Sequence, residues 1–177
     1  MDSIEDGYLV ITPVSHVSKD VIATLKSFDC ADSFLNDYAR TRLVKNDHRN
    51  LAKGFVAIRD NRIVGYITTK VMTLGREHFD LGGLPYAVPT ISIEQVATDI
   101  NYRNQQIGSR LTRKAFEIAL AASRNTGIKG ISLWSHPRAL EFYRKLGFQA
   151  LKTKQASNTL ELTLLFLPIE TLQRAVE

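Results

Sequence analysis

The stretch Tyr102–Leu111, YRNQQIGSRL, lies where a strand-like segment changes into a long amphipathic helix. The preceding residues, ISIEQVATD, are typical of a β-strand, and from Gln106 to about Thr126 apolar residues recur at helical spacing until Gly127 ends the pattern. A turn at the N-terminus of a helix presents free backbone N–H groups and the positive end of the helix dipole. The stretch therefore predicts a site for a phosphate group.

The side chains of this stretch narrow the kind of phosphate site. Arg103 would add a fixed charge, and Gly108 would allow close approach of the backbone. The stretch lacks the Gly-Lys-Ser/Thr ending of nucleotide triphosphatases and the three-glycine dinucleotide fingerprint. Gln106 stands where a second glycine would be expected. Taken alone, the stretch leaves open an ordinary surface turn with a solvated Arg103.

Strands and helices mix on both sides of this turn, without a repeat, a low-complexity tract or a linker. The pair Asp60-Asn61 predicts the turn of a hairpin, and the second half contains a β-α-β crossover. The expected elements are the strand Tyr8–Thr12, a helix from Asp29 to about Lys45, the hairpin Gly54–Met72, the strand Thr90–Thr98, the helix 106–126, the strand 128–135, the helix 137–147 and the strand Thr159–Leu167. The chain is therefore predicted to form one domain, residues 1–177, of mixed α/β class.

Composition argues against several classes of protein. The chain of 177 residues is 44% hydrophobic, and no apolar run reaches the roughly 18 residues of a membrane span. Its N-terminus lacks the pattern of a secretory signal, and one cysteine, Cys30, cannot form an intrachain disulfide. The histidines lack metal-ligand spacing; they are His16, His48, His78 and His136. We therefore expect a soluble, cytoplasmic protein without a metal.

The net charge of +5 has two interpretations. Many small proteins are mildly basic, and a polyanionic partner, a nucleic acid or a phosphate-rich cofactor, is the functional interpretation. A group of cations on and after the first predicted helix suits RNA phosphates, with a solvated helix face as the alternative. The cations are Arg40, Arg42, Lys45, Arg49 and Lys53. The apolar stripe of the same helix comprises Ala31, Phe34, Leu35, Tyr38, Ala39 and Leu43.

Three motifs in the second half follow one another in an order and spacing that resemble the GNAT superfamily of acyl-CoA-dependent N-acetyltransferases. They are Val96-Ala97-Thr98-Asp99, then Tyr102-Arg103-x-x-x-Ile107-Gly108-Ser109-x-Leu111, then Ala139-x-x-Phe142-Tyr143-x-x-Leu146-Gly147-Phe148. The resemblance covers roughly Gly54–Leu167. It implies the acyl-CoA N-acyltransferase fold, with a central, mostly antiparallel sheet flanked by helices, and acetyl-CoA as co-substrate without a metal.

The resemblance also implies roles for individual residues. The strand corresponding to Gln95–Thr98 offers backbone groups to the pantetheine arm, here from Val96, Ala97 and Thr98. The following loop holds the CoA pyrophosphate, here through Arg103, Asn104, Gln105, Gln106, Ile107, Gly108 and Ser109. Tyr143 matches the tyrosine that commonly protonates the departing thiolate. Two residues depart from the family pattern: Gln106 replaces the first loop glycine, and His136 stands where an asparagine often begins the last motif.

Direct acetyl transfer needs a neutral amine to attack the thioester and an acid to protonate the leaving sulfur. A lysine amine has a pKa of about 10.4 and is almost wholly protonated at neutral pH, whereas an α-amino group titrates near about 8. The chemistry therefore favours an α-amino acceptor. Glu94, on the cofactor strand, is the candidate base and substrate contact, with a solvent-facing or ion-paired side chain as the alternative. For Tyr143 the alternative is packing beside Phe142.

The segment FDCADSFLNDYARTRLVKN, in the first half, is similar to the Phe-x-Cys-x-x-x-x-Leu-Asn-x-aromatic segment of GNAT toxins from bacterial toxin–antitoxin modules. The matching residues are Phe28, Cys30, Leu35, Asn36 and Tyr38. This resemblance implies a toxin that acetylates the α-amino group of aminoacyl-tRNA and so blocks translation. It also implies a ribbon-helix-helix antitoxin as partner and a homodimer.

Within that segment, most side chains are expected to be structural. Phe28, Leu35 and Tyr38 share one predicted helical face, which favours core positions over substrate contacts. Cys30 is expected to be a small buried hydrophobe because the sequence places no activating histidine beside it. Asn36 is expected to cap or brace a neighbouring loop. The segment thus indicates lineage more than mechanism.

Two alternatives to the aminoacyl-tRNA toxin stay open. A GNAT enzyme of this kind could acetylate a small-molecule or protein amine instead. From a different class, the chain could be a catalytically silent acetyl-CoA-binding or partner-binding module. The altered loop at Gln106 would then be the change that removed catalysis.

Overall fold

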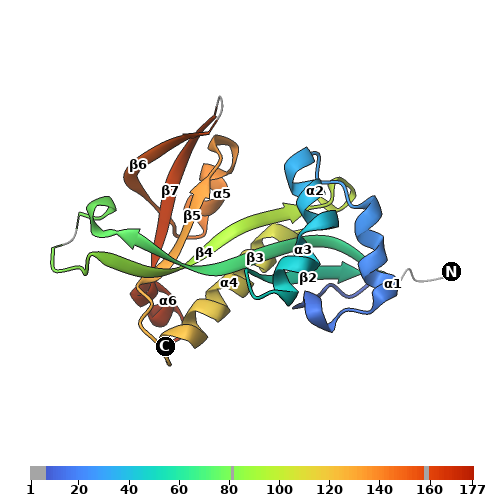
Figure 1. The fold of residues 1–177 in the computed structure, drawn as a ribbon, viewed down its shortest axis with the longest axis horizontal. Coiled ribbons are helices and arrows are strands. Elements are labelled where there is room, and N and C mark those ends of the chain that lie inside the picture. The colour runs from blue at the N-terminus through green and yellow to red at the C-terminus, as the bar shows by residue number, and fades with distance from the viewer. Residues whose placement is uncertain (1–6, 81, 158–159) are drawn as a thin grey trace. The chain divides into compact units, whose positions relative to one another are not determined.

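The computed structural model describes residues 7–80, 82–157 and 160–177, and Figure 1 labels its helices and strands. The strands are β1 (Val10–Pro13), β2 (Lys53–Arg59), β3 (Arg62–Gly75), β4 (Ala87–Thr98), β5 (Gly130–Ser135), β6 (Gln149–Ser157) and β7 (Leu160–Pro168). The α-helices are α1 (Lys19–Ile22), α2 (Ser33–Thr41), α3 (Leu43–His48), α4 (Ile107–Ser123), α5 (Leu140–Lys145) and α6 (Ile169–Ala175). The 3-10 helices are η1 (Val14–His16), η2 (Ala23–Ser27), η3 (Arg76–His78), η4 (Ile100–Tyr102) and η5 (Pro137–Ala139).

The strands form one mixed sheet in the order β1-β2-β3-β4-β5-β7-β6. The pairs β1–β2, β2–β3, β5–β7 and β6–β7 are antiparallel, whereas β4–β5 is parallel because α4 connects the two strands as a crossover. The hairpin between β2 and β3 turns at Asp60 and Asn61, both in the left-handed region (φ +51° and +57°), as a two-residue hairpin turn requires. The predicted mixed α/β class with a mostly antiparallel sheet is confirmed.

Two compact units divide the described residues. Unit 1 takes those of Met1–Thr69 and Gln95–Thr112, with β1, β2, α1 to α3 and the turn from β4 into α4. Unit 2 takes those of Lys70–Glu94 and Arg113–Glu177, with β5 to β7, α5 and α6. The predicted cofactor-binding residues therefore lie in unit 1, and Tyr143 lies in unit 2. One domain covering residues 1–177 stays a prediction.

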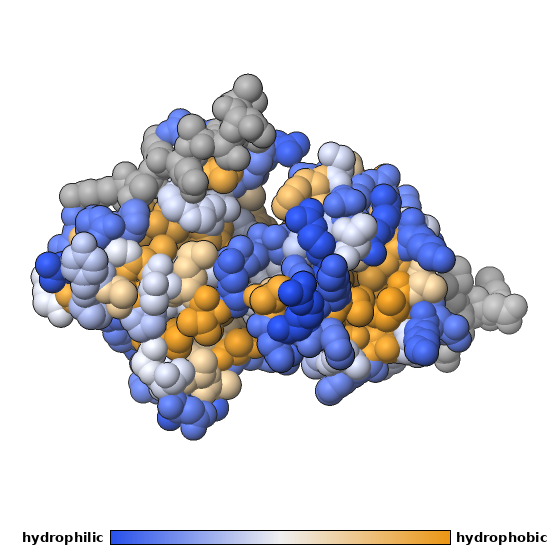
Figure 2. Space-filling model, viewed as in Figure 1, coloured by the Kyte–Doolittle hydropathy of each residue, from blue (hydrophilic) through white to orange (hydrophobic). Residues whose placement is uncertain are grey.

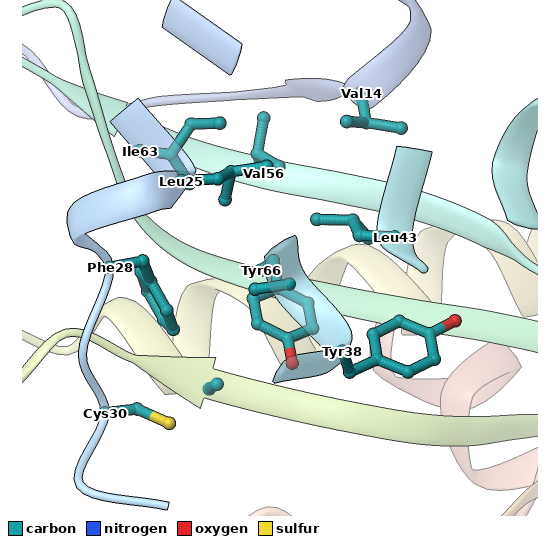
Figure 3. Packing of buried hydrophobic residues seen from close by; sticks show 11 residues of the cluster. Val14, Leu25, Phe28, Cys30, Tyr38, Leu43, Val56, Ile63 and Tyr66 are labelled. Carbon is teal, nitrogen blue, oxygen red and sulfur yellow. The ribbon is translucent and has the colours of Figure 1, made fainter. Parts of the chain in front are cut away.

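Tyr66, on β3, stands in the middle of the apolar core of unit 1 (Figure 3). Its ring meets Phe28 edge to face at 5.6 Å and stacks on Tyr38 at 6.2 Å, measured between ring centroids. Its hydroxyl donates to the backbone oxygen of Leu35 at 2.7 Å, and burial raises its pKa. Phe28 and Tyr38 are buried and Leu35 packs against the cluster. The expectation that these three residues belong to the core is confirmed.

The predicted helix from Asp29 to about Lys45 is wrong in its bounds. Asp32 caps α2 by accepting a hydrogen bond from the backbone N–H of Leu35 at 3.0 Å. Arg42 then departs from helical geometry, with φ −122°, so that α2 and α3 are separate helices. Phe34, placed in the apolar stripe, is 55% exposed. The periodicity joined α2 and α3 because a pattern of apolar residues does not register a change of direction between two short helices.

The separation of α2 from α3 lets α3 pack on the start of β2. The Asp47 carboxylate, buried on α3, accepts a hydrogen bond from the backbone N–H of Gly54 at 2.9 Å. A Cβ on Gly54 would lie 2.8 Å from a methyl carbon of Leu43, so glycine permits this close packing. This contact fixes the position of α3 and therefore of Lys45, which α3 carries.

Unit 2 is built on β5, β7 and β6. Thr90, on β4, shares a 2.8 Å hydrogen bond with Ser132 on β5 inside the parallel ladder. Phe79 meets Phe166 edge to face at 5.0 Å, and Lys129 pairs with Glu170 of α6 at 2.7 Å.

The strand β6 and the helices α1 and α6 were not predicted. The predicted strand Thr159–Leu167 corresponds to β7, and its first residue, Thr159, lies outside the described residues. Among those that are described, no helix combines the length and apolarity needed to cross a membrane.

Candidate functional site

The turn from β4 into α4, residues 99–106, is called the β4–α4 loop below. The β4 strand ends at Thr98, and the fully buried Asp99 follows it. The backbone N–H of Asp99 donates to Val64 on β3 at 2.9 Å, and its Oδ1 accepts from the backbone N–H of Asn101 at 3.0 Å. The helix α4 begins at Ile107, which is buried. The strand, turn and helix start expected from the sequence are confirmed.

Gln106 has the backbone conformation of a glycine. Its φ is +60°, and that of Asn104 is +62°, so two non-glycine residues of the loop lie in the left-handed region. A residue with a Cβ loses roughly 1–2 kcal/mol in this conformation, which explains why glycine is common in such loops. The Gln106 side chain is exposed. Gln106 therefore adopts a backbone conformation that favours glycine, although it carries a side chain.

Gly65, on β3, lets the loop region pack closely. A Cβ at this position would lie 3.0 Å from the backbone oxygen of Ala97 and 3.0 Å from a methyl carbon of Ile107. It would also lie 3.1 Å from Leu111. Glycine therefore allows β3 to approach both the end of β4 and the start of α4.

The end of β4 carries backbone groups that are not used in the β4–β5 ladder. That ladder pairs Thr90, Ile91 and Ser92 with β5 and does not extend to Gln95–Thr98. The side chain of Gln95 instead bonds Thr68 on β3. Ala97 is buried, and Val96 and Thr98 are half-buried. The strand end predicted to contact pantetheine thus has backbone groups without a β5 partner.

Arg103 is held in place rather than freely solvated. Its Nη2 donates to the backbone oxygen of Cys30 at 2.9 Å, although the side chain is largely exposed. Only one of its five N–H donors is used by this bond. The Arg103 guanidinium is therefore anchored beside the loop, and its role in binding a phosphate stays a prediction.

A pocket of about 620 Å³ adjoins the loop in unit 1. The Arg59 guanidinium, on β2, donates to the side-chain oxygen of Gln105. The lining residues are Gly7, Tyr8, Leu9, Arg59, Tyr102 and Gln105. Sequence reasoning missed Arg59, since it lies 46 residues from Gln105 and only strand pairing brings it to the loop.

Tyr143 is buried on α5. Its ring meets those of Phe142 at 5.0 Å and Phe148 at 5.6 Å, both edge to face. Burial raises the pKa of its hydroxyl to about 12, so Tyr143 is a neutral phenol with a proton to donate at physiological pH. His136, at the asparagine position, accepts a hydrogen bond at Nδ1 from the backbone N–H of Arg138 at 3.3 Å. The histidine therefore performs the helix-capping role that an asparagine could perform.

Glu94 has partners of its own. One carboxylate oxygen accepts from the Ser92 hydroxyl at 2.6 Å, and the other lies 3.6 Å from the Lys70 ammonium. The side chain is 25% exposed. The structure thus shows the ion-paired alternative, which makes Glu94 a poor candidate for a free base.

The five cations predicted to bind RNA do not share one environment. Three are engaged within unit 1: Arg40 donates to the backbone oxygen of Phe28 at 2.7 Å, Arg42 pairs with Asp37 at 3.4 Å, and Lys53 donates to the backbone oxygen of Asp47 at 3.3 Å. Lys45 and Arg49 are exposed. Within the part of the chain that the structure describes, the side chains of these two have no hydrogen-bond or ion-pair partner. Lys45 and Arg49 are therefore the cations free to meet a polyanion.

Two features of the toxin-like segment agree with expectation. Cys30 is buried, and burial raises the pKa of its thiol, which disfavours the nucleophilic thiolate. Asn36 braces the preceding turn: its Oδ1 accepts from the backbone N–H of Cys30 at 2.9 Å, and its Nδ2 donates to Asp29 at 3.0 Å. In residues 7–80, 82–157 and 160–177 no three His, Cys, Asp or Glu side chains cluster as metal ligands.

Comparison with known families assigns the chain to a family. The model of the acetyltransferase (GNAT) domain matches residues 50–150, more than half of the chain. The chain belongs to the GNAT acetyltransferase family. It is therefore an acetyltransferase of the GNAT fold, as the three motifs predicted.

Several proteins similar to this chain are toxins. A tRNA-acetylating toxin of Mycobacterium tuberculosis (strain ATCC 25618 / H37Rv) is 29% identical over 133 residues, which cover 72% of this GNAT chain and 79% of the relative. The structure of AtaT complexed with acetyl-methionyl-tRNAfMet superposes with a TM-score of 0.80 at 23% identity, covering 96% of this chain and 100% of AtaT. A mutant AtaT toxin bound to the C-terminus of the antitoxin AtaR and acetyl-CoA gives a TM-score of 0.73 at 21% identity, covering 95% and 98%. The predicted resemblance to GNAT toxins is confirmed.

Proposed function

We propose that this GNAT acetyltransferase uses acetyl-CoA to acetylate the α-amino group of aminoacyl-tRNA, and that it acts as a translation-blocking toxin. The observation that carries the proposal is the β4–α4 loop, which combines left-handed backbone at Asn104 and Gln106 with the N-terminus of α4. The 29% identical relative is a tRNA-acetylating toxin, which supports the choice of acceptor.

The loop suits the CoA pyrophosphate. The N-terminus of α4, a helix of 17 residues, provides unpaired N–H groups at Ile107, Gly108 and Ser109 and the positive end of its dipole. Arg103, fixed by Cys30, and Arg59, fixed by Gln105, place two guanidinium groups beside it. Backbone groups of Val96, Ala97 and Thr98, which have no partner on β5, would bond the pantetheine arm, and acetyl-CoA when bound would supply the activated acetyl group.

Gln106→Gly should change the Kd for acetyl-CoA by less than about tenfold, or ~1.4 kcal/mol. The reason is that Gln106 already has the backbone conformation of glycine and an exposed side chain, so the backbone N–H groups of the site stay in place. Isothermal titration calorimetry of acetyl-CoA binding measures the effect. A larger loss would show that the Gln106 side chain is itself a ligand.

For the transfer step we propose that Tyr143 donates its proton to the departing sulfur. The neutral α-amino group attacks the thioester carbon, the C–S bond breaks, and the sulfur leaves as the thiol with the Tyr143 proton, while the amine releases one proton. A buried phenol with a raised pKa remains protonated until this step. Glu94 is paired with Lys70 and is not assigned the role of base. An α-amino group titrates near about 8, so a useful fraction of the acceptor is already neutral and needs no strong base.

The exposed surface of α2 and α3 suits an RNA. Lys45 and Arg49 are free cations, and the Arg42 guanidinium lies 5.1 Å from the ring centre of Phe34, which is 55% exposed. Figure 2 shows hydrophilic and hydrophobic side chains side by side over these helices. Cations beside an exposed aromatic ring are typical of surfaces that bind phosphates and stacked bases.

Changing Lys45 and Arg49 together to Glu should raise the KM for charged tRNA by about tenfold or more and leave the Kd for acetyl-CoA unchanged. Loss of two phosphate contacts should also reduce the slope of log K against log salt by roughly 1.4–1.8. Filter binding of charged tRNA at several salt concentrations measures the slope, and initial-rate kinetics with varied charged tRNA measures the KM. Arg113→Glu with Arg124→Glu, an equal charge change on and just after α4, is the control. Equal losses in both double variants would assign the effect to net charge alone.

Acceptor class is tested by incubating the protein with labelled acetyl-CoA and either charged or uncharged tRNA. Label should enter charged tRNA, as acetyl-aminoacyl-tRNA, and not uncharged tRNA. Labelling of a polyamine or peptide instead would favour the small-molecule or protein-amine acetyltransferase, and acetyl-CoA binding without any transfer would favour the silent module. Expression without a partner should arrest growth.

The remaining partners follow from the proposed toxin role. We propose a ribbon-helix-helix antitoxin, encoded beside this protein, as the neutralising partner, since a toxin of the same fold is bound to the C-terminus of its antitoxin. A cytoplasmic homodimer of the single domain 1–177 completes the proposal. Co-purification with the product of the adjacent gene tests the partner, and light scattering tests the dimer.

A further inference from the structure

The turn Asp29–Ala31, in the toxin-like segment, is joined to the β4–α4 loop by hydrogen bonds. The backbone N–H of Asp29 donates to the Asp99 carboxylate at 3.2 Å, and the backbone oxygen of Asp29 accepts from the N–H of Ile100 at 2.8 Å. The backbone oxygen of Cys30 accepts from Arg103 at 2.9 Å. The turn therefore holds the loop at its beginning and at its arginine, across about seventy residues of sequence.

Asn36 holds that turn in its conformation. Its Oδ1 accepts from the backbone N–H of Cys30, and its Nδ2 donates to Asp29 Oδ1, which also accepts from the backbone N–H of Ala31 at 2.8 Å. Ala31 has φ +63°, a conformation that a residue with a Cβ adopts only when its surroundings require it. The Asn36 amide thus supports a strained turn through both of its polar atoms.

Asn36 is itself placed on a rigid element. The preceding residue, Leu35, accepts from the Tyr66 hydroxyl in the core at 2.7 Å, and its N–H is capped by Asp32. The core therefore fixes the position of the Asn36 amide, the amide fixes the Asp29–Ala31 turn, and the turn fixes the β4–α4 loop. Among the described residues, Asn36 forms no hydrogen bond with the loop itself.

We propose that Asn36 is a positioning residue for acetyl-CoA binding: through the Asp29–Ala31 turn it holds Asp99, Ile100 and Arg103 where the pyrophosphate is bound. This inference rests on the proposed use of acetyl-CoA, and it assigns a physical role to the Cys-x-x-x-x-Leu-Asn part of the segment. Asparagine is required because one amide must accept from Cys30 and donate to Asp29. Leucine can do neither, and aspartate cannot donate.

The negative charge of Asp29 makes the requirement for an uncharged asparagine at position 36 stricter. Hydrogen bonds from the N–H of Ala31 and from the Asn36 amide hold the pKa of the Asp29 carboxyl below its ordinary value, with Arg40 and Arg103 adding to the effect. An Asn36→Asp substitution would therefore place a second carboxylate at about the 3.0 Å distance that now separates amide and carboxylate. The turn would be pushed open.

The test compares Asn36→Asp with Asn46→Asp. Asn46, on α3, donates one amide bond to the Tyr38 hydroxyl at 3.2 Å, so the control also loses one donor and gains one charge in unit 1. Without ligand, the amide of Ile100 should exchange its hydrogen about tenfold faster in Asn36→Asp and at the wild-type rate in the control. The Kd and KM for acetyl-CoA should rise about tenfold, with the KM for charged tRNA and kcat at saturating acetyl-CoA within about twofold of wild type.

A second substitution provides the rescue. Adding Asp29→Asn to Asn36→Asp removes the pair of carboxylates and offers a new amide donor, so acetyl-CoA affinity should recover by about threefold or more. A merely structural role for Asn36 predicts no such recovery and predicts equal effects on both substrates.

The outcomes separate this inference from the proposed function. If wild-type protein binds no acetyl-CoA, the proposed function fails, and hydrogen exchange at Ile100 still tests the brace. If Asn36→Asp leaves both the exchange at Ile100 and the affinity for acetyl-CoA at wild-type values, the positioning role is overturned. Faster exchange with unchanged affinity also overturns it, because the loop would then not need the brace.

Discussion

Tyr143→Phe should lower kcat for acetyl transfer by about 10²-fold or more while leaving the Kd for acetyl-CoA within about twofold of wild type. Phenylalanine keeps the ring that packs against Phe142 and Phe148 and removes the hydroxyl alone. A 10²-fold loss corresponds to about 2.7 kcal/mol of transition-state stabilisation, within the range of a general acid. Single-turnover kinetics with charged tRNA, beside calorimetry for acetyl-CoA, separates chemistry from binding.

A matched control distinguishes the loss of the proton donor at Tyr143 from the effect of removing any tyrosine hydroxyl. Tyr86 lies in unit 2 and is 80% exposed, with the Arg76 guanidinium 5.5 Å from its ring centre. Tyr86→Phe keeps that contact and should retain full turnover. If Tyr143→Phe also retained full turnover, the leaving sulfur would have to obtain its proton from another donor.

The raised pKa of Tyr143 predicts an effect of pH on stability that is independent of catalysis. Below about pH 10 the phenol is neutral in both states and contributes no pH dependence. Between its ordinary pKa of 10.0 and its folded pKa of about 12, the unfolded chain ionises first, so the free energy of unfolding falls as pH rises. Tyr143 contributes a fall of about 1.4 kcal/mol per pH unit, in addition to the falls from the buried Tyr66 hydroxyl and Cys30 thiol, whose pKa values burial also raises. The slope should therefore be smaller by about this amount in the Tyr143→Phe protein, as urea unfolding of both proteins at pH 9 to 11 would measure.

Phe28→Ala should cost roughly 3–5 kcal/mol of stability, a large part of the 5–15 kcal/mol that stabilises a typical domain. Phe28 is 0% exposed, and its ring lies edge to face against Tyr66 (Figure 3). Alanine would leave a cavity beside the most central residue of the unit 1 core. Urea unfolding followed by circular dichroism measures the loss.

Phe34→Ala is the control for Phe28→Ala. Both residues belong to the same segment, but Phe34 is 55% exposed and its contact with Arg42 is a surface cation–π pair. Such a pair contributes about 0.5–1 kcal/mol, so the loss should stay below about 1 kcal/mol. Similar losses in the two variants would mean that Phe28 is not part of a closely packed core.

Prediction from the sequence succeeded where structure is local. The β2–β3 hairpin, the strand before the β4–α4 loop and the stop at Gly147, with φ +103°, all follow from turn residues and short-range periodicity. It failed at the helix predicted for residues 29–45, where Arg42 separates two helices whose apolar residues form one continuous pattern. Periodicity records which residues are apolar and does not record a change in the direction of the chain.

The candidate site shows the same division. Its loop could be located from YRNQQIGSRL because strand, turn and helix are adjacent in the chain. The partners of its side chains could not be predicted, because Arg103 meets Cys30 across 73 residues and Asp29 meets Asp99 across 70. Likewise, which cations of the basic group are free depended on contacts with Phe28, Asp37 and Asp47.

The sequence by itself determined the GNAT family, the mixed sheet and the place of the turn between β4 and α4, since these depend on motif order and on backbone preferences of neighbouring residues. Only the tertiary structure decided that Gln106 keeps the backbone of a glycine, that Glu94 is ion-paired with Lys70, and that Asn36 supports the loop through a second turn. Each of these depends on hydrogen bonds or packing between segments that folding brings together, and no short-range pattern encodes them.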